Sequence, residues 1–127
     1  MKKQENQILK ILVVDDNQDS RELVIKVLRK ESVQLFEAID GKDALEKVEQ
    51  ARPNIILMDI SLPKIDGYEV TRRLKNSHHF SAIPIIALTA HAMKGDKEKA
   101  LAAGCDGYIS KPINIHGFYE QIASFLH

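Results

Sequence analysis

The sequence predicts an α/β fold, in which helices cover both faces of a doubly wound parallel sheet. Short aliphatic runs recur along the chain, and they are continuous rather than alternating, which is typical of strands buried on both faces. Segments with helical periodicity accompany these runs and carry charged residues on their opposite faces. Strand and helix alternate five times. This alternation favours parallel strands joined by right-handed crossovers.

Five strands are expected in chain order. The clearest candidates are three aliphatic runs: Ile11-Leu12-Val13-Val14, Ile55-Ile56-Leu57-Met58 and Ile85-Ile86-Ala87-Leu88. Two weaker candidates extend from Val33 to Ile39 and from Cys105 to Ile109.

Apolar residues at helical spacing predict which helix faces are buried. These faces are made of Leu23, Val24, Val27 and Leu28, then Ala44, Leu45 and Val48, then Val70 and Leu74, and finally Phe118, Ile122 and Phe125. Turns or helix ends are expected at the dipeptides Asp40-Gly41, Arg52-Pro53, Asp66-Gly67 and Ala103-Gly104.

The composition fits one domain over residues 1–127, with a polar, flexible tail at residues 1–7. Because 18 basic residues balance 18 acidic ones, we expect neither a general nucleic-acid binder nor a polybasic membrane anchor. The longest apolar run near the start is too short to span a membrane. The single cysteine, Cys105, excludes an internal disulfide. We therefore expect a cytoplasmic protein.

Polar residues follow the predicted strands, at the sheet edge where sites in this fold lie. Asp15 and Asp16 follow the first aliphatic run, Asp59 the third strand, Thr89 the fourth and Lys111 the fifth. Taken singly, each has an ordinary alternative as a turn residue, helix cap or surface lysine. Together, three carboxylates at one edge would repel one another, so the site needs a cation. Oxygen ligands without a His or Cys cluster suit Mg²⁺, or Mn²⁺ in its place.

A divalent cation with carboxylates and one lysine is typical equipment for phosphoryl transfer. The chain lacks a G-x-x-x-x-G-K loop that would hold a nucleotide. The candidate nucleophile is then a carboxylate, which can form an acyl phosphate. Asp59 is the best choice, because it ends a central buried strand.

Four segments together resemble the receiver (response regulator) domain family of two-component signalling. They are Ile11-Leu12-Val13-Val14-Asp15-Asp16, Leu57-Met58-Asp59-Ile60-Ser61-Leu62-Pro63, Ala87-Leu88-Thr89-Ala90 and Tyr108-Ile109-Ser110-Lys111-Pro112. The resemblance runs from about Lys10 to the C-terminus and is specific because the order and spacing of all four segments match. It implies a flavodoxin-like fold of five parallel strands in the order 2-1-3-4-5 with five helices.

The resemblance also implies roles for the residues at the strand ends. Asp59 would accept a phosphoryl group from a phosphohistidine of a partner. Asp16, Asp59 and the backbone carbonyl of Ser61 would bind the metal directly, and Asp15 through coordinated water. Lys111 would contact the phosphoryl oxygens, with a cis peptide bond between Lys111 and Pro112.

A switch is implied as well. Thr89 would move to hydrogen-bond the phosphoryl group, and Tyr108 would swing into the space that Thr89 leaves. Ser61 and His91 would line the entrance to the phosphoryl group and modulate its lifetime, although two exposed loop side chains are an equal alternative. Partner specificity in this family lies on the first helix, here on a face that includes Ser20 and Val24.

These observations predict a single-domain response regulator that is a phosphoacceptor rather than a turnover enzyme. Its expected partners are a histidine kinase or histidine phosphotransfer protein and a downstream protein target, and it would be a monomer or a weak, phosphorylation-dependent dimer. One alternative is a receiver domain of a hybrid histidine kinase. A phosphatase of the haloacid-dehalogenase type would need a second Asp where Ser61 stands. The remaining alternative is a scaffold with a decayed site.

Overall fold

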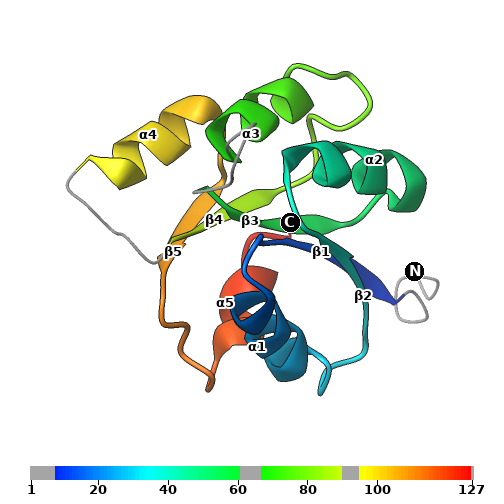
Figure 1. Cartoon of the computed structure of the whole chain (residues 1–127), viewed down its shortest axis with the longest axis vertical. Coiled ribbons are helices and arrows are strands. Elements are labelled where there is room, and N and C mark those ends of the chain that lie inside the picture. The colour runs from blue at the N-terminus through cyan, green and yellow to red at the C-terminus, as the bar shows by residue number, and fades with distance from the viewer. Residues whose placement is uncertain (1–7, 61–66, 90–94, 127) are drawn as a thin grey trace.

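The computed structural model describes residues 8–60, 67–89 and 95–126. Within them the chain forms a five-stranded parallel sheet in the order β2-β1-β3-β4-β5 (Figure 1). The elements in chain order are β1 (Leu9–Val14), α1 (Gln18–Leu28), β2 (Val33–Ala38), α2 (Gly41–Ala51), β3 (Ile55–Asp59), α3 (Gly67–Lys75), β4 (Ile85–Thr89), α4 (Asp96–Ala103), β5 (Gly107–Ser110) and α5 (Phe118–Ala123). The predicted fold class and strand order are confirmed.

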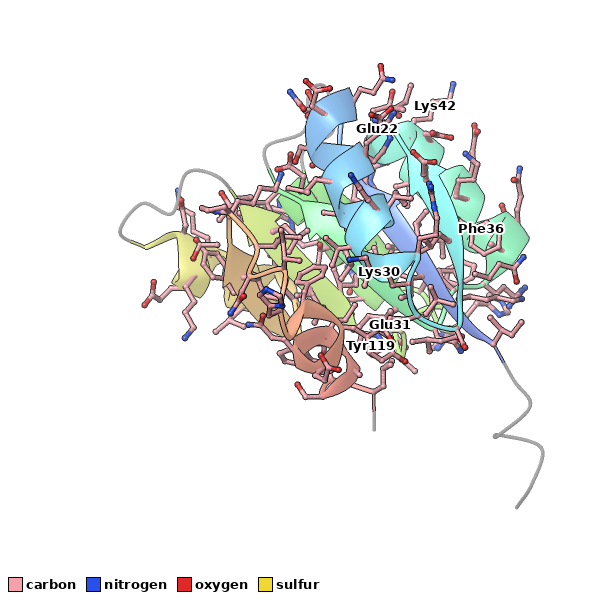
Figure 2. All side chains as sticks on the ribbon, turned by 90° about the horizontal axis from the view of Figure 1, so that it is seen from below. Glu22, Lys30, Glu31, Phe36, Lys42 and Tyr119 are labelled. Carbon is pink, nitrogen blue, oxygen red and sulfur yellow. The ribbon has the colours of Figure 1, made fainter. Side chains whose placement is uncertain are left out.

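Alternate residues of the three central strands face two separate hydrophobic cores. In β3, Ile56 and Met58 pack on the side of α2, α3 and α4, whereas Ile55 and Leu57 pack on the side of α1 and α5. Figure 2 views the α1 and α5 face, with Lys30 after α1 and Tyr119 on α5 labelled. Because helices cover both faces of the sheet, no side of the central strands faces solvent, and their sequences are continuous aliphatic runs.

The two weaker strands have different ends from those predicted. β2 stops at Ala38, because the Ile39 N–H is accepted by Asp43 Oδ2 at 3.0 Å and not by a neighbouring strand. β5 starts at Gly107, since Cys105 N donates to Ala100 O at 3.0 Å and completes the end of α4. The N–H groups of Ile39 and Cys105 therefore bond to residues of helices, although the apolar pattern assigns both residues to strands.

The buried face of α1 also differs from the prediction. Val24, Ile25 and Leu28 are buried, whereas Leu23 is 42% exposed. Residues 24, 25 and 28 share one side of a helix, so the stripe is turned by one position relative to the predicted one. Val24 is buried, as its helical spacing predicts, so its side chain offers little surface to the partner that the resemblance implied would contact it.

The sheet edge opposite the polar strand ends is held together by Lys75. Its ammonium donates to Ser81 O at 3.1 Å, Ile83 O at 2.9 Å and Asp106 Oδ2 at 2.8 Å. The same Asp106 oxygen accepts from Ile85 N at 2.9 Å, and Asp106 N donates to Ile85 O at 2.7 Å. The start of β4 and the approach to β5 are thereby fixed to α3.

Cys105 is buried, and its sulfur lies 3.7 Å from the Thr71 hydroxyl. Burial raises the pKa of the Cys105 thiol, which opposes formation of a reactive thiolate. No helix in the described ranges is long and apolar enough to cross a bilayer.

Gly67 is expected to tolerate no larger residue. A Cβ there would lie 2.5 Å from Ile60 Cα and 2.7 Å from Asp59 O, both backbone atoms that cannot give way cheaply. Gly67→Ala should lower the free energy of unfolding by about 1–3 kcal/mol, as overpacking does. Urea unfolding would measure the change, with the exposed Arg73→Ala in the same helix as control. An unchanged midpoint for Gly67→Ala would show that α3 is free to shift.

Candidate functional site

Three carboxylates meet at the carboxyl edge of the sheet, as the sequence predicts. Asp15 directly follows β1, Asp16 is its neighbour, and Asp59 is the last residue of β3. One carboxylate oxygen of each lies within 4.8 Å of the others. Asp15 is 1% exposed and Asp59 8% exposed, whereas Asp16 is open to solvent. The carboxylates of Asp15 and Asp59 are thus buried, and that of Asp16 is exposed to solvent.

Lys111 reaches this cluster from the end of β5. Its ammonium lies 2.8 Å from Asp15 Oδ2 and 3.8 Å from Asp59 Oδ2. It also donates to Ser20 Oγ at 2.7 Å. The Lys111 N–H donates to Thr89 O at 2.7 Å, and the peptide bond to Pro112 is cis, as the resemblance implied. The backbone therefore fixes the base of the lysine against β4, and two side chains fix its charged end.

The Asp15 carboxylate is stabilised in its charged form. Burial alone would raise the pKa of Asp15, but hydrogen bonds from Lys111, the Asn17 N–H and the Ser20 hydroxyl outweigh it and hold the pKa below its ordinary value. The Asn17 N–H donates to Oδ1 at 2.9 Å, opposite the lysine on Oδ2. Asp15 is thus ionised at neutral pH despite its burial.

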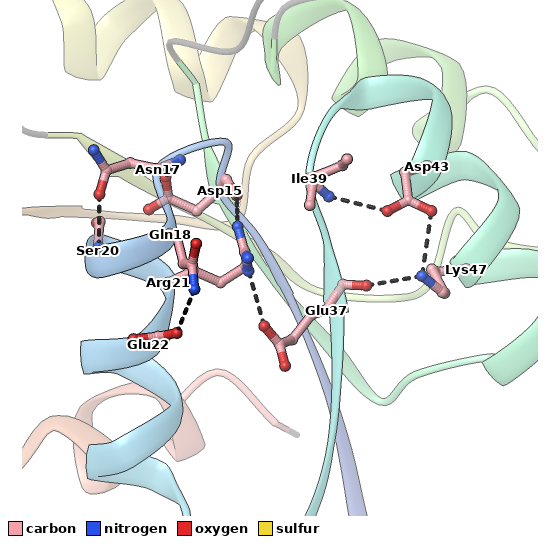
Figure 3. Close-up of polar contacts among 10 residues, drawn as sticks. All are labelled: Asp15, Asn17, Gln18, Ser20, Arg21, Glu22, Glu37, Ile39, Asp43 and Lys47. Atoms are coloured by element: carbon pink, nitrogen blue, oxygen red, sulfur yellow. Dashed lines mark hydrogen bonds and ion pairs between the residues drawn. The ribbon is translucent and has the colours of Figure 1, made fainter.

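Arg21 of α1 holds the backbone of Asp15. Its Nη1 donates to Asp15 O at 2.9 Å, and its Nε pairs with Glu37 Oε1 of β2 at 2.8 Å (Figure 3). Asp15 N donates in turn to Ala38 O at 3.1 Å. The turn that carries the acidic pair is therefore tied to both α1 and β2.

Thr89 and Tyr108 lie on the same face of the sheet. Thr89 ends β4 and is 1% exposed. It follows Ile85 and Ala87 at the two-residue period of a strand, and both of these face the α4 side. Tyr108 is half-buried, packs on that side and pairs with Ala87 across the β4–β5 ladder. Burial, with the Asp96 and Glu98 carboxylates nearby, raises the pKa of its phenol. The two residues of the predicted switch are therefore close neighbours.

Two predicted site residues, Ser61 and His91, lie outside the described residues. Three residues that the prediction did not assign to the site are part of it. Ser20 contacts the lysine, and the Arg21–Glu37 pair braces Asp15. In the sequence, the only indication of their role is their position: Ser20 and Arg21 are near the amino end of α1, and Glu37 is on β2.

The family model described as "Response regulator receiver domain" matches residues 11–123. The chain belongs to this family. It is a receiver domain, and its acidic cluster lies at the carboxyl ends of the parallel strands. Curated relatives of this receiver domain include the polar-differentiation response regulator DivK of Brucella anthropi, 40% identical over 116 residues, which cover 91% of this chain and 94% of DivK.

Solved structures similar to this receiver domain have the same fold. The chemotaxis response regulator CheY4 of Vibrio cholerae has a TM-score of 0.87 at 28% identity, with 94% of this chain and all of that chain (100%) covered. The receiver domain of the sensor histidine kinase PA1611 from Pseudomonas aeruginosa has a TM-score of 0.86 at 33% identity, with 94% and 98% covered. The latter structure is described as having a magnesium ion coordinated in its active-site cleft.

Proposed function

We propose that this receiver domain accepts a phosphoryl group on Asp59 from a phosphohistidine and changes its protein partners in response. The observation that carries the proposal is the placement of Asp59. It ends a strand buried on both faces, beside two further carboxylates and 3.8 Å from a lysine ammonium. A carboxylate with a cationic neighbour at its reacting side is arranged to attack a phosphoryl group whose charge the cation offsets.

The transfer would form one bond and break one. A carboxylate oxygen of Asp59 attacks the phosphorus, an O–P bond forms and the P–N bond to the donor histidine breaks. The electron pair of that bond stays on the imidazole nitrogen, which takes up a proton. The Lys111 ammonium offsets charge on the phosphoryl oxygens during the transfer.

Asp15, Asp16 and Asp59 fit a Mg²⁺ or Mn²⁺ ion. All three offer carboxylate oxygens, the ligands that such hard cations prefer, and the cluster has more negative charge than Lys111 neutralises. The magnesium in the related PA1611 receiver supports this assignment. A bound divalent cation would neutralise charge on the phosphoryl oxygens. We also propose, as the resemblance implies, that the backbone carbonyl of Ser61 is a ligand of this ion.

Mg²⁺ is expected to stabilise the folded protein, because it relieves repulsion among the three carboxylates and finds no such site in the unfolded chain. At a concentration about 100 times its Kd the gain would be about 2.7 kcal/mol. A thermal melt with and without MgCl₂ measures it, with NaCl at matched ionic strength as control. A melting temperature that does not respond to Mg²⁺ would contradict the metal site.

The switch that we propose uses Thr89 and Tyr108. Thr89 carries a hydroxyl donor at the end of β4, and Tyr108 lies two positions back across the ladder on the same face. Movement of the hydroxyl toward phosphorylated Asp59 would vacate space on the side of Tyr108, so phosphorylation would shift the population between two packings. Ser61 and His91 are proposed to modulate the lifetime of the phosphoryl group, which dephosphorylation rates of alanine variants would test.

The proposed partners follow from the family. Receiver domains interact with histidine kinases and downstream targets, and similarity to DivK supports a single-domain regulator that is phosphorylated by a kinase or a phosphotransfer protein. Similarity to the PA1611 receiver supports the alternative of a hybrid-kinase receiver. We propose a cytoplasmic site of action, and a monomer or weak dimer on phosphorylation. Light scattering of both forms would test the last point.

We propose a stoichiometric phosphoacceptor that catalyses only its own phosphorylation and dephosphorylation, and not a turnover enzyme. Intact mass after incubation with acetyl phosphate and Mg²⁺ tests it. The expected result is one acid-stable, base-labile phosphoryl adduct per chain. Sustained hydrolysis of small phosphate esters would favour a phosphatase instead. If no adduct forms, a beryllofluoride titration separates a receiver that needs its cognate donor from a scaffold with a decayed site.

A further inference from the structure

The Ser20 hydroxyl links helix α1 to the Lys111 ammonium across the rim of the acidic site. We propose that Ser20 is a positioning residue that holds this ammonium on the α1 side of the cluster, near Asp59 but out of hydrogen-bonding contact with it. The inference rests on the proposed phosphorylation of Asp59 and assigns a role in it to a residue of α1.

The contacts of the ammonium carry the argument. Lys111 has three N–H donors, and two of them are directed to Asp15 Oδ2 at 2.8 Å and Ser20 Oγ at 2.7 Å. Both acceptors come from the amino end of α1, since Asp15 lies just before this helix and Ser20 lies in its first turn. The Asp59 oxygen is 3.8 Å away, beyond the range of a charge-assisted hydrogen bond.

The separation matters for the chemistry. An ammonium bonded directly to Asp59 would occupy a carboxylate oxygen and withdraw charge from the nucleophile. At 3.8 Å the ammonium makes no charge-assisted hydrogen bond to that oxygen and stays close enough to meet a phosphoryl oxygen attached there. A flexible lysine does not keep such a position by itself, since its stem has many rotamers.

A hydroxyl suits this role because it offers the ammonium a neutral acceptor. Ser20 Oγ accepts from the ammonium at 2.7 Å, and the Asp15 carboxylate accepts from the same ammonium at 2.8 Å. The Ser20 hydroxyl also helps to lower the pKa of Asp15. A fourth carboxylate in place of Ser20 would draw the ammonium further from Asp59 and add to the repulsion in the cluster.

The surroundings allow Ser20 to be changed without disturbing the core. Ser20 is half-buried and lines a cavity of about 450 Å³ between α1 and the segment after β5, together with Asp19, Leu23, Val24, Lys111, Pro112 and Ile113. Leu23, which lines the same cavity from the next turn of α1 and is 42% exposed, offers a matched control.

The test compares Ser20→Ala, Ser20→Thr and Leu23→Ala. Without the hydroxyl, the ammonium should turn to the next acceptor, so a crystal structure of metal-free Ser20→Ala should place Lys111 Nζ about 2.8 Å from an Asp59 oxygen. Labelling by acetyl phosphate with Mg²⁺ should slow about tenfold, the effect of one hydrogen bond to a charged group. Ser20→Thr, which keeps the hydroxyl, should restore the rate, and Leu23→Ala should label like the parent.

Each outcome decides the question. The proposal is overturned if Ser20→Ala labels at the parental rate, if Ser20→Thr is as slow as Ser20→Ala, or if the ammonium keeps its position in the metal-free variant. If the parent protein itself takes up no phosphoryl group and binds no beryllofluoride, the proposed function fails. The crystallographic distance still tests the positioning role in that case.

Discussion

Asp59→Asn is expected to take up no phosphoryl group from acetyl phosphate. The amide has nearly the same shape as the carboxylate but lacks the anionic oxygen that attacks phosphorus, so the loss should be complete rather than partial. The fold should remain, because Asp59 is at the end of β3 and the substitution removes one of three mutually repelling charges. Intact mass measures the adduct, and a thermal melt without Mg²⁺ measures the stability.

The matched control is Asp19→Asn, which removes an exposed carboxylate near the site but outside the cluster of three. It should label like the parent protein. An adduct at another residue of Asp59→Asn would refute the assignment of the nucleophile. Loss of labelling in both variants would show that the effect comes from removing a negative charge near the site and not from removing the nucleophile.

Lys111→Met is expected to lose labelling and to be less stable without a divalent cation. Methionine keeps most of the aliphatic stem but leaves the Asp15 carboxylate, 1% exposed, without its ion-pair partner. Breaking a buried pair in this way costs about 3 kcal/mol at the low end, which suits a lysine whose side chain is 15% exposed. Saturating Mg²⁺ should recover part of the loss, since the cation takes over the neutralisation of Asp15.

The same variant should respond differently to acid. The depressed pKa of Asp15 means that the folded parent binds fewer protons than the unfolded chain in mild acid. Its contribution to stability is therefore complete above the ordinary pKa of 3.8 and is lost as the pH falls through the lower folded value. In Lys111→Met the folded pKa rises, so the contribution shrinks and fails at higher pH.

Urea unfolding between pH 3 and 7 measures this difference, with the exposed Lys30→Met as control for the loss of one positive charge. Parental labelling and a parental pH profile in Lys111→Met would remove the lysine from the proposed site.

The sequence predicts the sheet and the residues at its carboxyl edge because both depend on local patterns. Continuous aliphatic runs such as residues 55–58 identify doubly covered strands, and parallel pairing then brings Asp15, Asp59 and Lys111 to one edge whatever their separation along the chain. Their arrival at one edge of the sheet follows from topology, whereas the position of the Lys111 ammonium there also depends on its contacts with Asp15 and Ser20.

The remaining features depend on tertiary contacts that no local pattern encodes. The bond between Ser20 and Lys111 joins residues 91 positions apart and depends on where the segment after β5 lies against α1. Leu23 and Val24 are equally apolar, so only the rotation of α1 on the sheet decides which is buried. Cys105 has an apolar side chain suited to a strand, but its N–H completes the end of α4.

The Lys75 contacts have a consequence for the proposed switch between Thr89 and Tyr108. Because Lys75 and Asp106 anchor the amino ends of β4 and β5, these strands cannot slide past one another without breaking several hydrogen bonds at once. Their ladder keeps a constant alignment, in which Ala87 stays beside Tyr108. We therefore expect the proposed switch to work by rotation of side chains, with the alignment of β4 and β5 unchanged.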